Sequence, residues 1–204
     1  WDTKGMWQEV KDMSPLKYCL NIEELVIVSS KVSDLTPLSG LTALRSLTLA
    51  ESAVSALTPL EGLSQLLELN LWGNQITDIT PVKALKNLER LDLSNNQIAD
   101  ISALTELKQL KALLVMGNPV GDFSPLAELK QLQELWVLDN LVKSVDVQPL
   151  GALTGLQKLG VDCNFQDVSF VGNMPDLEEL RIDNCRELPE TLVKLKKLKV
   201  FCSL

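Results

Sequence analysis

The sequence predicts an α/β repeat fold in which short coils stack side by side into a solenoid. Three observations lead to this prediction. A short leucine pattern returns about every 22 residues, the apolar spacing changes within each unit, and an asparagine stands at a fixed place in most units. The chain has 204 residues, of which 46% are hydrophobic, so it is long enough to build one extended core.

The repeating pattern LxxLxL, or an apolar equivalent, gives the strongest of these signals. Five successive steps between copies are 22 residues long, and the last three are 24, 21 and 21. Chance does not keep such a register, so we interpret residues 1–204 as a single repeat domain. It comprises a degenerate first coil or cap over residues 1–21, eight repeats over 22–197 and a partial repeat over 198–204. The pattern starts at Ile22, Leu44, Leu66, Leu88, Leu110, Leu132, Leu156, Leu177 and Leu198.

Each unit combines two apolar periods. Leu91 and Leu93 alternate with polar residues, which is typical of a strand. Later in the unit, Leu104, Leu107 and Leu110 recur every three residues, which is typical of a 3₁₀-like segment. A single unit cannot bury these leucines alone, whereas stacked units form a continuous core.

Polar residues also return at fixed positions. An asparagine follows each strand and is expected to be buried, with its amide bonded to the backbone. Each helical return is expected to start with a Ser or Thr hydroxyl as N-cap and a proline at the first helical position, since these residues begin helices well. Aspartates just before them favour a helix N-terminus. The asparagines are Asn74, Asn96, Asn118, Asn140 and Asn164, with Ser30, Ser52 and Cys185 in the same column; the aspartates are Asp12, Asp34, Asp78, Asp100, Asp122 and Asp167.

The unit LxxLxLxxNxIxDIxxLxxLxx resembles the 22-residue leucine-rich repeat of the internalin type, from about Val10 to Leu204. The resemblance implies a curved solenoid with a parallel β-sheet on the concave face and short 3₁₀ or extended segments on the convex face. It also implies a protein-binding module, of a kind often found on bacterial surfaces. We therefore expect an extracellular or cell-surface protein. The alternative is the cytoplasm, which unpaired cysteine thiols would favour.

Composition excludes several classes of function. The net charge of −8 disfavours nucleic-acid binding. The absence of histidine removes the commonest general base and metal ligand. No glycine-rich phosphate loop occurs, and no apolar run approaches the ~18 residues of a membrane span. We expect a non-enzymatic module without cofactor or metal that binds a protein or peptide. The alternatives are a recognition domain attached to a catalytic domain outside this chain, and a structural spacer.

The candidate binding residues lie on the concave face, where alternate strand residues point. Leu114, Met116, Trp136 and Leu138 are expected to form a contiguous exposed apolar block there, and such a block is typical of a protein interface. Trp72 lies two coils from Met116, roughly 10 Å away at strand spacing. The alternative is that these side chains pack on one another without any ligand. The predicted partner-binding residues are Trp72, Asp92, Leu114, Met116, Glu134, Trp136, Leu138 and Asp139.

Two further features bear on function. Asp139, Asp162 and Asp183 are expected to form a solvated acidic strip, with a Ca²⁺ site as the weaker alternative. The two extra residues of the 24-residue step are expected to bulge from the 141–149 loop beside Leu138, as a tolerated insertion or a functional lip.

The four cysteines carry no zinc motif. Cys19 aligns with core leucines and is expected to be buried as a small hydrophobe. Cys163 and Cys185 lie on neighbouring coils, which leaves their pairing open, and Cys202 falls in the last partial repeat. At the other end, Trp1, Met6 and Trp7 are expected to cover the first coil, because a solenoid needs its end leucines shielded.

Overall fold

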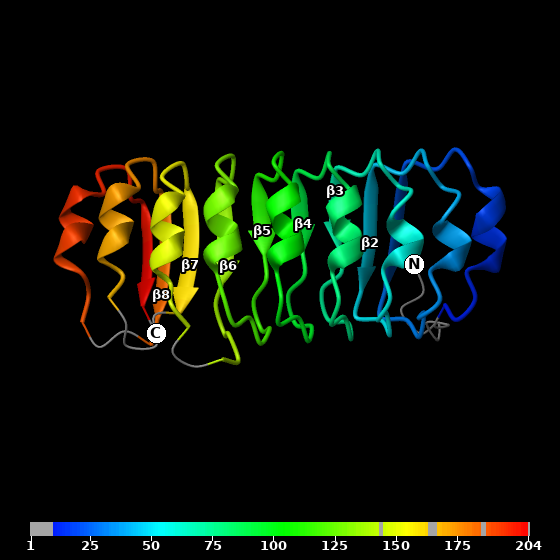
Figure 1. Cartoon of the computed structure of the whole chain (residues 1–204), viewed down its shortest axis with the longest axis horizontal. Coiled ribbons are helices and arrows are strands. Elements are labelled where there is room, and N and C mark those ends of the chain that lie inside the picture. The colour runs from blue at the N-terminus through cyan, green and yellow to red at the C-terminus, as the bar shows by residue number, and fades with distance from the viewer. Residues whose placement is uncertain (1–9, 143–144, 163–166, 185–186, 204) are drawn as a thin grey trace, which may run out of the picture.

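The computed structural model describes residues 10–142, 145–162, 167–184 and 187–203. In this part of the chain, nine strands alternate with nine short 3₁₀ helices, one of each in every coil. The strands form one row and the helices a second row, and the chain advances along the long axis of the molecule from coil to coil (Figure 1). The predicted leucine-rich solenoid is confirmed.

All nine strands pair in parallel in chain order. The leucines stay in register, as in the pairing of Leu47 with Leu69. The 24-residue step also keeps this register, because Glu134 pairs with Lys158. The two extra residues are therefore accommodated outside the sheet. The strands are β1 Glu24–Val28, β2 Ser46–Ala50, β3 Glu68–Asn70, β4 Arg90–Asp92, β5 Ala112–Leu114, β6 Glu134–Val137, β7 Lys158–Asp162, β8 Glu179–Asp183 and β9 Val200–Ser203.

The returning segments are single 3₁₀ turns on the convex side, as the three-residue leucine spacing predicts. Leu104, Leu107 and Leu110 are completely buried, and so are Leu91 and Leu93 from the strand side. One apolar cluster runs through the coils from Met13 to Leu195. The helices are η1 Ser14–Tyr18, η2 Thr36–Leu38, η3 Thr58–Leu60, η4 Thr80–Ala84, η5 Ser102–Glu106, η6 Ser124–Glu128, η7 Gln148–Ala152, η8 Ser169–Asn173 and η9 Glu190–Lys194.

The asparagine ladder, formed by Asn74, Asn96 and Asn118, is buried and bonded to backbone, as predicted. The Asn96 Oδ1 accepts a hydrogen bond from the Ile76 N–H at 3.0 Å. Its Nδ2 donates to the carbonyls of Leu71 and Leu93, at 3.0 and 2.9 Å. Each asparagine thereby ties its own coil to the preceding one.

The hydrogen bonds made by this column of residues differ on both sides of the asparagine ladder. Ser30 and Ser52 share a single hydroxyl hydrogen bond of 2.7 Å. Asn140 is only half-buried, and its Nδ2 donates to the Val120 carbonyl at 2.8 Å. Asn164 and Cys185 lie outside the described residues.

The prediction that Ser or Thr hydroxyls cap the helices is wrong. The hydroxyl residue is the first helical residue, and the N-cap before it, such as Leu35 of η2, makes no side-chain cap bond. Instead the carboxylate two residues earlier accepts the backbone N–H, as Asp34 does from Thr36 at 2.9 Å. This is an Asx-turn, which a short carboxylate side chain forms readily. The same bond at Asp146, which takes the Gln148 N–H at 2.9 Å, was missed because glutamine replaces the hydroxyl there.

One repeated position went unnoticed in the sequence. The residue that follows the last concave side chain of a coil adopts a left-handed backbone, with φ between 48° and 70°. Glycine is the residue best suited to this conformation, and it occupies the position only in two central coils. Asn95, Asn184 and Asp139 are the next best suited, since short polar side chains tolerate it. The seven residues are Ser29, Glu51, Gly73, Asn95, Gly117, Asp139 and Asn184.

The expectation of a buried Cys19 is wrong, because this side chain is exposed. It ends η1, which has no buried residue, in the first coil that the structure describes. The predicted cap residues Trp1, Met6 and Trp7 lie outside the described residues, as do Cys163 and Cys185 and part of the 141–149 loop.

Candidate binding surface on the concave face

The strands present three columns of outward side chains to the concave face. In the coil of β5, the first, middle and third columns contain Ala112, Leu114 and Met116, in that order. Leu114 on β5 lies directly opposite Trp136 on β6 and Asp92 on β4. Backbone pairing continues past the short strands, since the Gly117 N–H donates to the Leu138 carbonyl at 3.2 Å. The third column, which contains Trp72 and Met116, therefore stays in register. The fold therefore places six of the predicted residues, all except Leu138 and Asp139, along the concave columns.

Four of these residues form the apolar patch, defined here as Trp72, Leu114, Met116 and Trp136. Each is half-buried, so the patch is closely packed against the sheet and keeps part of its apolar surface accessible. Between Trp72 and Met116 in the third column, Ser94 is completely buried. Its hydroxyl has no hydrogen-bond partner among the described residues. The third column is thus closed to water at this point.

The expectation that Leu138 is exposed is wrong, because only 2% of its surface is accessible. The reason lies in Gly160 on the next strand. A Cβ atom added to Gly160 would lie 2.3 Å from the Trp136 Cε3 atom and 3.0 Å from the Leu138 Cδ1 atom. The missing side chain leaves space into which both neighbours settle. Leu138 therefore belongs to the support beneath the patch.

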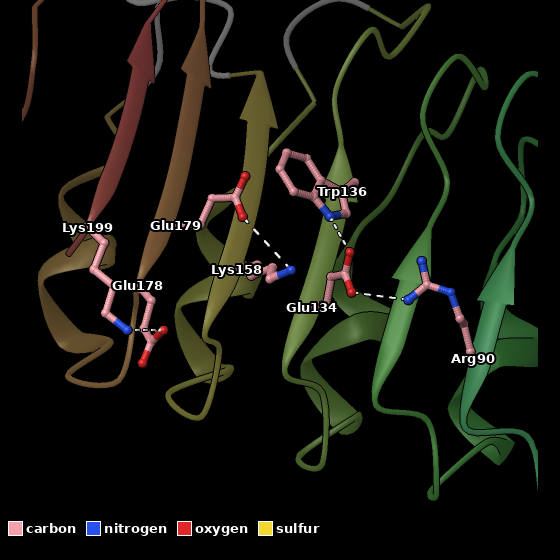
Figure 2. Close-up of polar contacts among 7 residues, drawn as sticks. All are labelled: Arg90, Glu134, Trp136, Lys158, Glu178, Glu179 and Lys199. Atoms are coloured by element: carbon pink, nitrogen blue, oxygen red, sulfur yellow. Dashed lines mark hydrogen bonds and ion pairs between the residues drawn. The ribbon is translucent and has the colours of Figure 1, made fainter. Parts of the chain in front are cut away.

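The orientation of Trp136 is fixed by polar contacts as well as by packing. Its indole Nε1 donates to the Glu134 Oε1 at 2.9 Å. The other oxygen of Glu134 accepts from the Arg90 Nη1 at 3.1 Å, and Arg90 reaches it from β4, two strands away (Figure 2). Each carboxylate oxygen thus has one partner, and Glu134 links the indole to a guanidinium.

The charge of Glu134 is stabilised by the same contacts. Burial raises the pKa of Glu134, but the hydrogen bonds from Trp136 and Arg90 and the positive charge of Arg90 outweigh it, so the pKa lies below its usual value. The carboxylate is therefore ionised at neutral pH and accepts the indole N–H. Lys158 and Glu179 form a longer ion pair of 4.0 Å beyond Trp136 (Figure 2).

The expected solvated acidic strip does not exist as such. Asp162 and Asp183 are buried, at 8% and 7% exposure. Arg181 donates to both oxygens of Asp183, and the Asn184 Nδ2 donates to Asp162 at 3.0 Å. Asp139 is exposed and has a turn-forming left-handed backbone. Within the described ranges, no group of three His, Cys, Asp or Glu residues is placed to hold a metal ion, so the Ca²⁺ alternative has no support.

Sequence reasoning missed a polar hollow that adjoins the apolar patch. It has a volume of about 130 Å³ and spans β2 to β4. Its lining includes three small polar side chains of the middle concave column, Thr48, Asn70 and Asp92, next to the larger Leu114 on β5. That run of three short polar residues was visible in the sequence and could have indicated the hollow. The lining residues are Ser46, Leu47, Thr48, Glu68, Leu69, Asn70, Arg90 and Asp92.

Charge is unevenly arranged around the polar hollow. The Cα of Arg90 lies opposite that of Glu68, yet its guanidinium is bonded to Glu134 on the far side. Among the described residues, no Lys or Arg forms an ion pair with Glu68 or Asp92. One Asp92 oxygen accepts the Ser94 N–H at 2.9 Å. Two carboxylates therefore border the hollow without a cation of their own.

Known proteins with the same architecture include proteins from Listeria monocytogenes and Leptospira interrogans. The leucine-rich repeat region family matches residues 21–202. An internalin from Listeria monocytogenes is 28% identical, with a TM-score of 0.77, and the match covers 95% of this chain and 64% of that one. Internalin C2 from Listeria monocytogenes is 29% identical, with a TM-score of 0.85 and coverages of 92% and 84%.

A more distant structure supports the fold alone. A leucine-rich repeat protein from Leptospira interrogans is 24% identical, with a TM-score of 0.80, and the match covers 93% of this chain and 51% of that one. No curated protein matches the chain. The chain thus spans less than two thirds of the first internalin and about half of the Leptospira protein. In the portion described, no helix is both long and apolar enough to cross a membrane.

Proposed function

The chain belongs to the leucine-rich repeat family, and from this premise we propose that it is a non-catalytic module that binds a protein or peptide partner on its concave face. Leucine-rich repeat domains are generally protein–protein interaction modules. The specific surface comes from this chain's own residues, because a fold by itself does not fix a function.

The observation that carries the proposal is the way Trp136 is held. A half-buried tryptophan lies over Gly160, with its N–H bonded to an ionised Glu134. Its position is set before any partner arrives, so little conformational entropy would be lost on binding. Tryptophan is also among the side chains most often found as the central anchor of an interface. Leu114 lies beside it, and charged residues surround both.

Two other roles fit the chain less well. A structural spacer would gain solubility from a polar concave face, whereas this face carries the apolar patch. A recognition domain attached to a catalytic domain would use the same surface, so it shares the proposed binding mode. We place the protein on a bacterial surface or outside the cell, because of its likeness to internalins. A cytoplasmic location is the alternative.

The test is the affinity of the Trp136→Ala variant for a partner isolated by pull-down. Titration calorimetry should show binding at least tenfold weaker than wild type, which corresponds to about 1.4 kcal/mol or more. Val200→Ala is the matched control, since Val200 is an exposed apolar residue on β9, three strands from Trp136. It should bind as wild type does. Unchanged affinity in a folded Trp136→Ala variant would show that the partner docks elsewhere.

A further inference from the structure

The polar hollow and the apolar patch lie next to each other on an unpartnered sheet face. We propose that together they take one extended segment of the partner, with a Lys or Arg side chain in the hollow and a large apolar side chain on Leu114 and Trp136. This inference rests on the proposed function and adds the chemistry and the spacing of the partner's residues.

The hollow is suited to a long, thin side chain with a polar end. Thr48, Asn70 and Asp92 are smaller than Leu114, the next residue in the same column, and they line a depression of about 130 Å³. The aliphatic part of a lysine or arginine can lie on short side chains while its charged end reaches a carboxylate. The hydroxyl and amide groups of the lining supply acceptors for the remaining N–H groups.

The charges around the polar hollow favour a positively charged side chain. Glu68 and Asp92 border the hollow, and the nearest cation, Arg90, is bonded to Glu134 instead. A cationic side chain would form the ion pairs that the chain itself does not supply, while an anionic one would meet two like charges. The whole chain is acidic as well, with a net charge of −8, so long-range attraction also favours a basic segment.

The strand spacing sets the distance between the two side chains. The hollow is centred on β3, and the contact between Leu114 and Trp136 lies between β5 and β6. At about 4.8 Å per strand, the separation is roughly 12 Å. An extended peptide advances about 3.4 Å per residue. Because successive side chains of an extended chain point to opposite faces, the basic and apolar residues should be an even number of positions apart, and a separation of four positions fits this distance.

Other occupants of this face fit less well. A second copy of the chain would bring a strongly acidic surface against the carboxylates of the hollow, and nucleic acid would bring phosphates. Neither supplies a cation next to an apolar group. A basic, partly apolar polypeptide satisfies both halves of the surface at once.

Phage display of random 12-residue peptides against the purified chain tests the proposal. The enriched peptides should carry Lys or Arg four positions from Leu, Ile, Met or Phe. An enriched peptide, made synthetically, is then titrated into wild type, Trp136→Ala and the double variant Glu68→Gln/Asp92→Asn. Both variants should lose at least tenfold in affinity. Asparagine at 92 keeps an oxygen for the Ser94 N–H, so the double variant should stay folded.

Glu61→Gln is the matched control, because Glu61 is an exposed carboxylate at the end of η3, on the helix side of the solenoid and away from the concave face. It should bind the peptide as wild type does, and added salt should weaken wild-type binding more than binding by the double variant.

The outcomes separate this inference from the proposed function. Enriched peptides without a basic residue, or peptides indifferent to the double variant but weakened by Trp136→Ala, would overturn the basic-segment inference and support the proposed function. Peptides indifferent to both variants would count against both. If no peptide is enriched, the extended-segment inference fails, and the titration of the folded partner with Trp136→Ala still decides the proposed function.

Discussion

The asparagine ladder and the concave face lie on the same coils and differ in what they repeat. Asn74, Asn96 and Asn118 make the same set of backbone bonds in successive coils. Along the concave face, by contrast, Asn70, Asp92, Leu114 and Trp136 follow one another on four neighbouring strands. Inside these three central coils every unit has the same backbone groups to satisfy, so one residue type serves in all three. The side chains on the concave face have no common backbone group to satisfy, so their residue type changes from strand to strand.

The 24-residue coil shows how far the scaffold can vary without disturbing that face. At Asn140 the amide no longer repeats the bonds of the ladder and donates to the Val120 carbonyl instead. The strand register nevertheless continues from β6 to β7. The insertion is absorbed next to the irregular rung, and the surface that carries Trp136 remains continuous.

Replacing a central member of the ladder should have the largest effect on stability. The Asn96→Ala substitution removes the acceptor of the buried Ile76 N–H, which donates to the Asn96 side chain in the native protein. We expect a loss of about 1–3 kcal/mol in the free energy of unfolding. Asn140→Ala is the control, because Asn140 is half-buried, and it should lose clearly less. Urea denaturation of the two variants checks this, and equal losses would contradict the distinction between regular and irregular rungs.

A smaller loss is expected at the left-handed position that precedes the ladder. Gly117 has φ of 64°, and an added Cβ would lie next to the Asn95 side chain. Gly117→Ala should therefore cost about 1–2 kcal/mol. Gly121→Ala is the matched control four residues later, since no atom lies within 4 Å of its added Cβ. Thermal unfolding should leave Gly121→Ala near wild type or slightly above it. A harmless Gly117→Ala would mean that the turn readily changes conformation.

The weakest individual effects are expected at the Asx-turns. The backbone N–H and hydroxyl of Ser102 lower the pKa of Asp100, and equivalent hydrogen bonds lower the pKa of Asp34 and Asp122. A folded pKa below the unfolded value of about 4 stabilises the protein above that value. This stabilisation is lost as the pH falls through the folded pKa.

Asp100→Asn keeps the accepting oxygen and removes the ionisable group. Urea midpoints measured from pH 7 down to pH 2 should therefore fall less steeply for this variant than for wild type. An identical acid profile would show that the Asp100 carboxylate does not contribute to acid stability.

The repeat made most of the fold predictable from sequence, because it fixed the strands, the core leucines and the ladder at once. The individual errors came from groups that depend on neighbours outside their own unit. Leu138 is buried because Gly160 on the next strand has no side chain, and Cys19 is exposed at the end of η1, a helix with no buried residue. Periodicity assigns a position to a column, but it does not give the size of the neighbour in the adjacent coil.

The candidate surface was predictable in its location and less so in its details. Alternation along the strands placed Leu114 and Trp136 side by side. The sequence did not indicate that Arg90 would pass over β5 to reach Glu134, since Glu68 lies opposite its own Cα. Because Arg90 pairs with Glu134, the polar hollow keeps its acidic character. This pairing depends on side-chain geometry, which a repeat pattern does not encode.

The central claim is that repeated buried residues hold the fold and varied concave residues are available for binding. Urea unfolding of Trp136→Ala beside Asn96→Ala tests it most directly, because both changes lie in the central part of the solenoid and neither needs a known partner. We expect Trp136→Ala to lose less stability than Asn96→Ala, as a partly exposed side chain contributes less to folding than a buried hydrogen-bonding group. A loss for Trp136→Ala as large as that for Asn96→Ala would show that the tryptophan belongs to the scaffold and would contradict the claim.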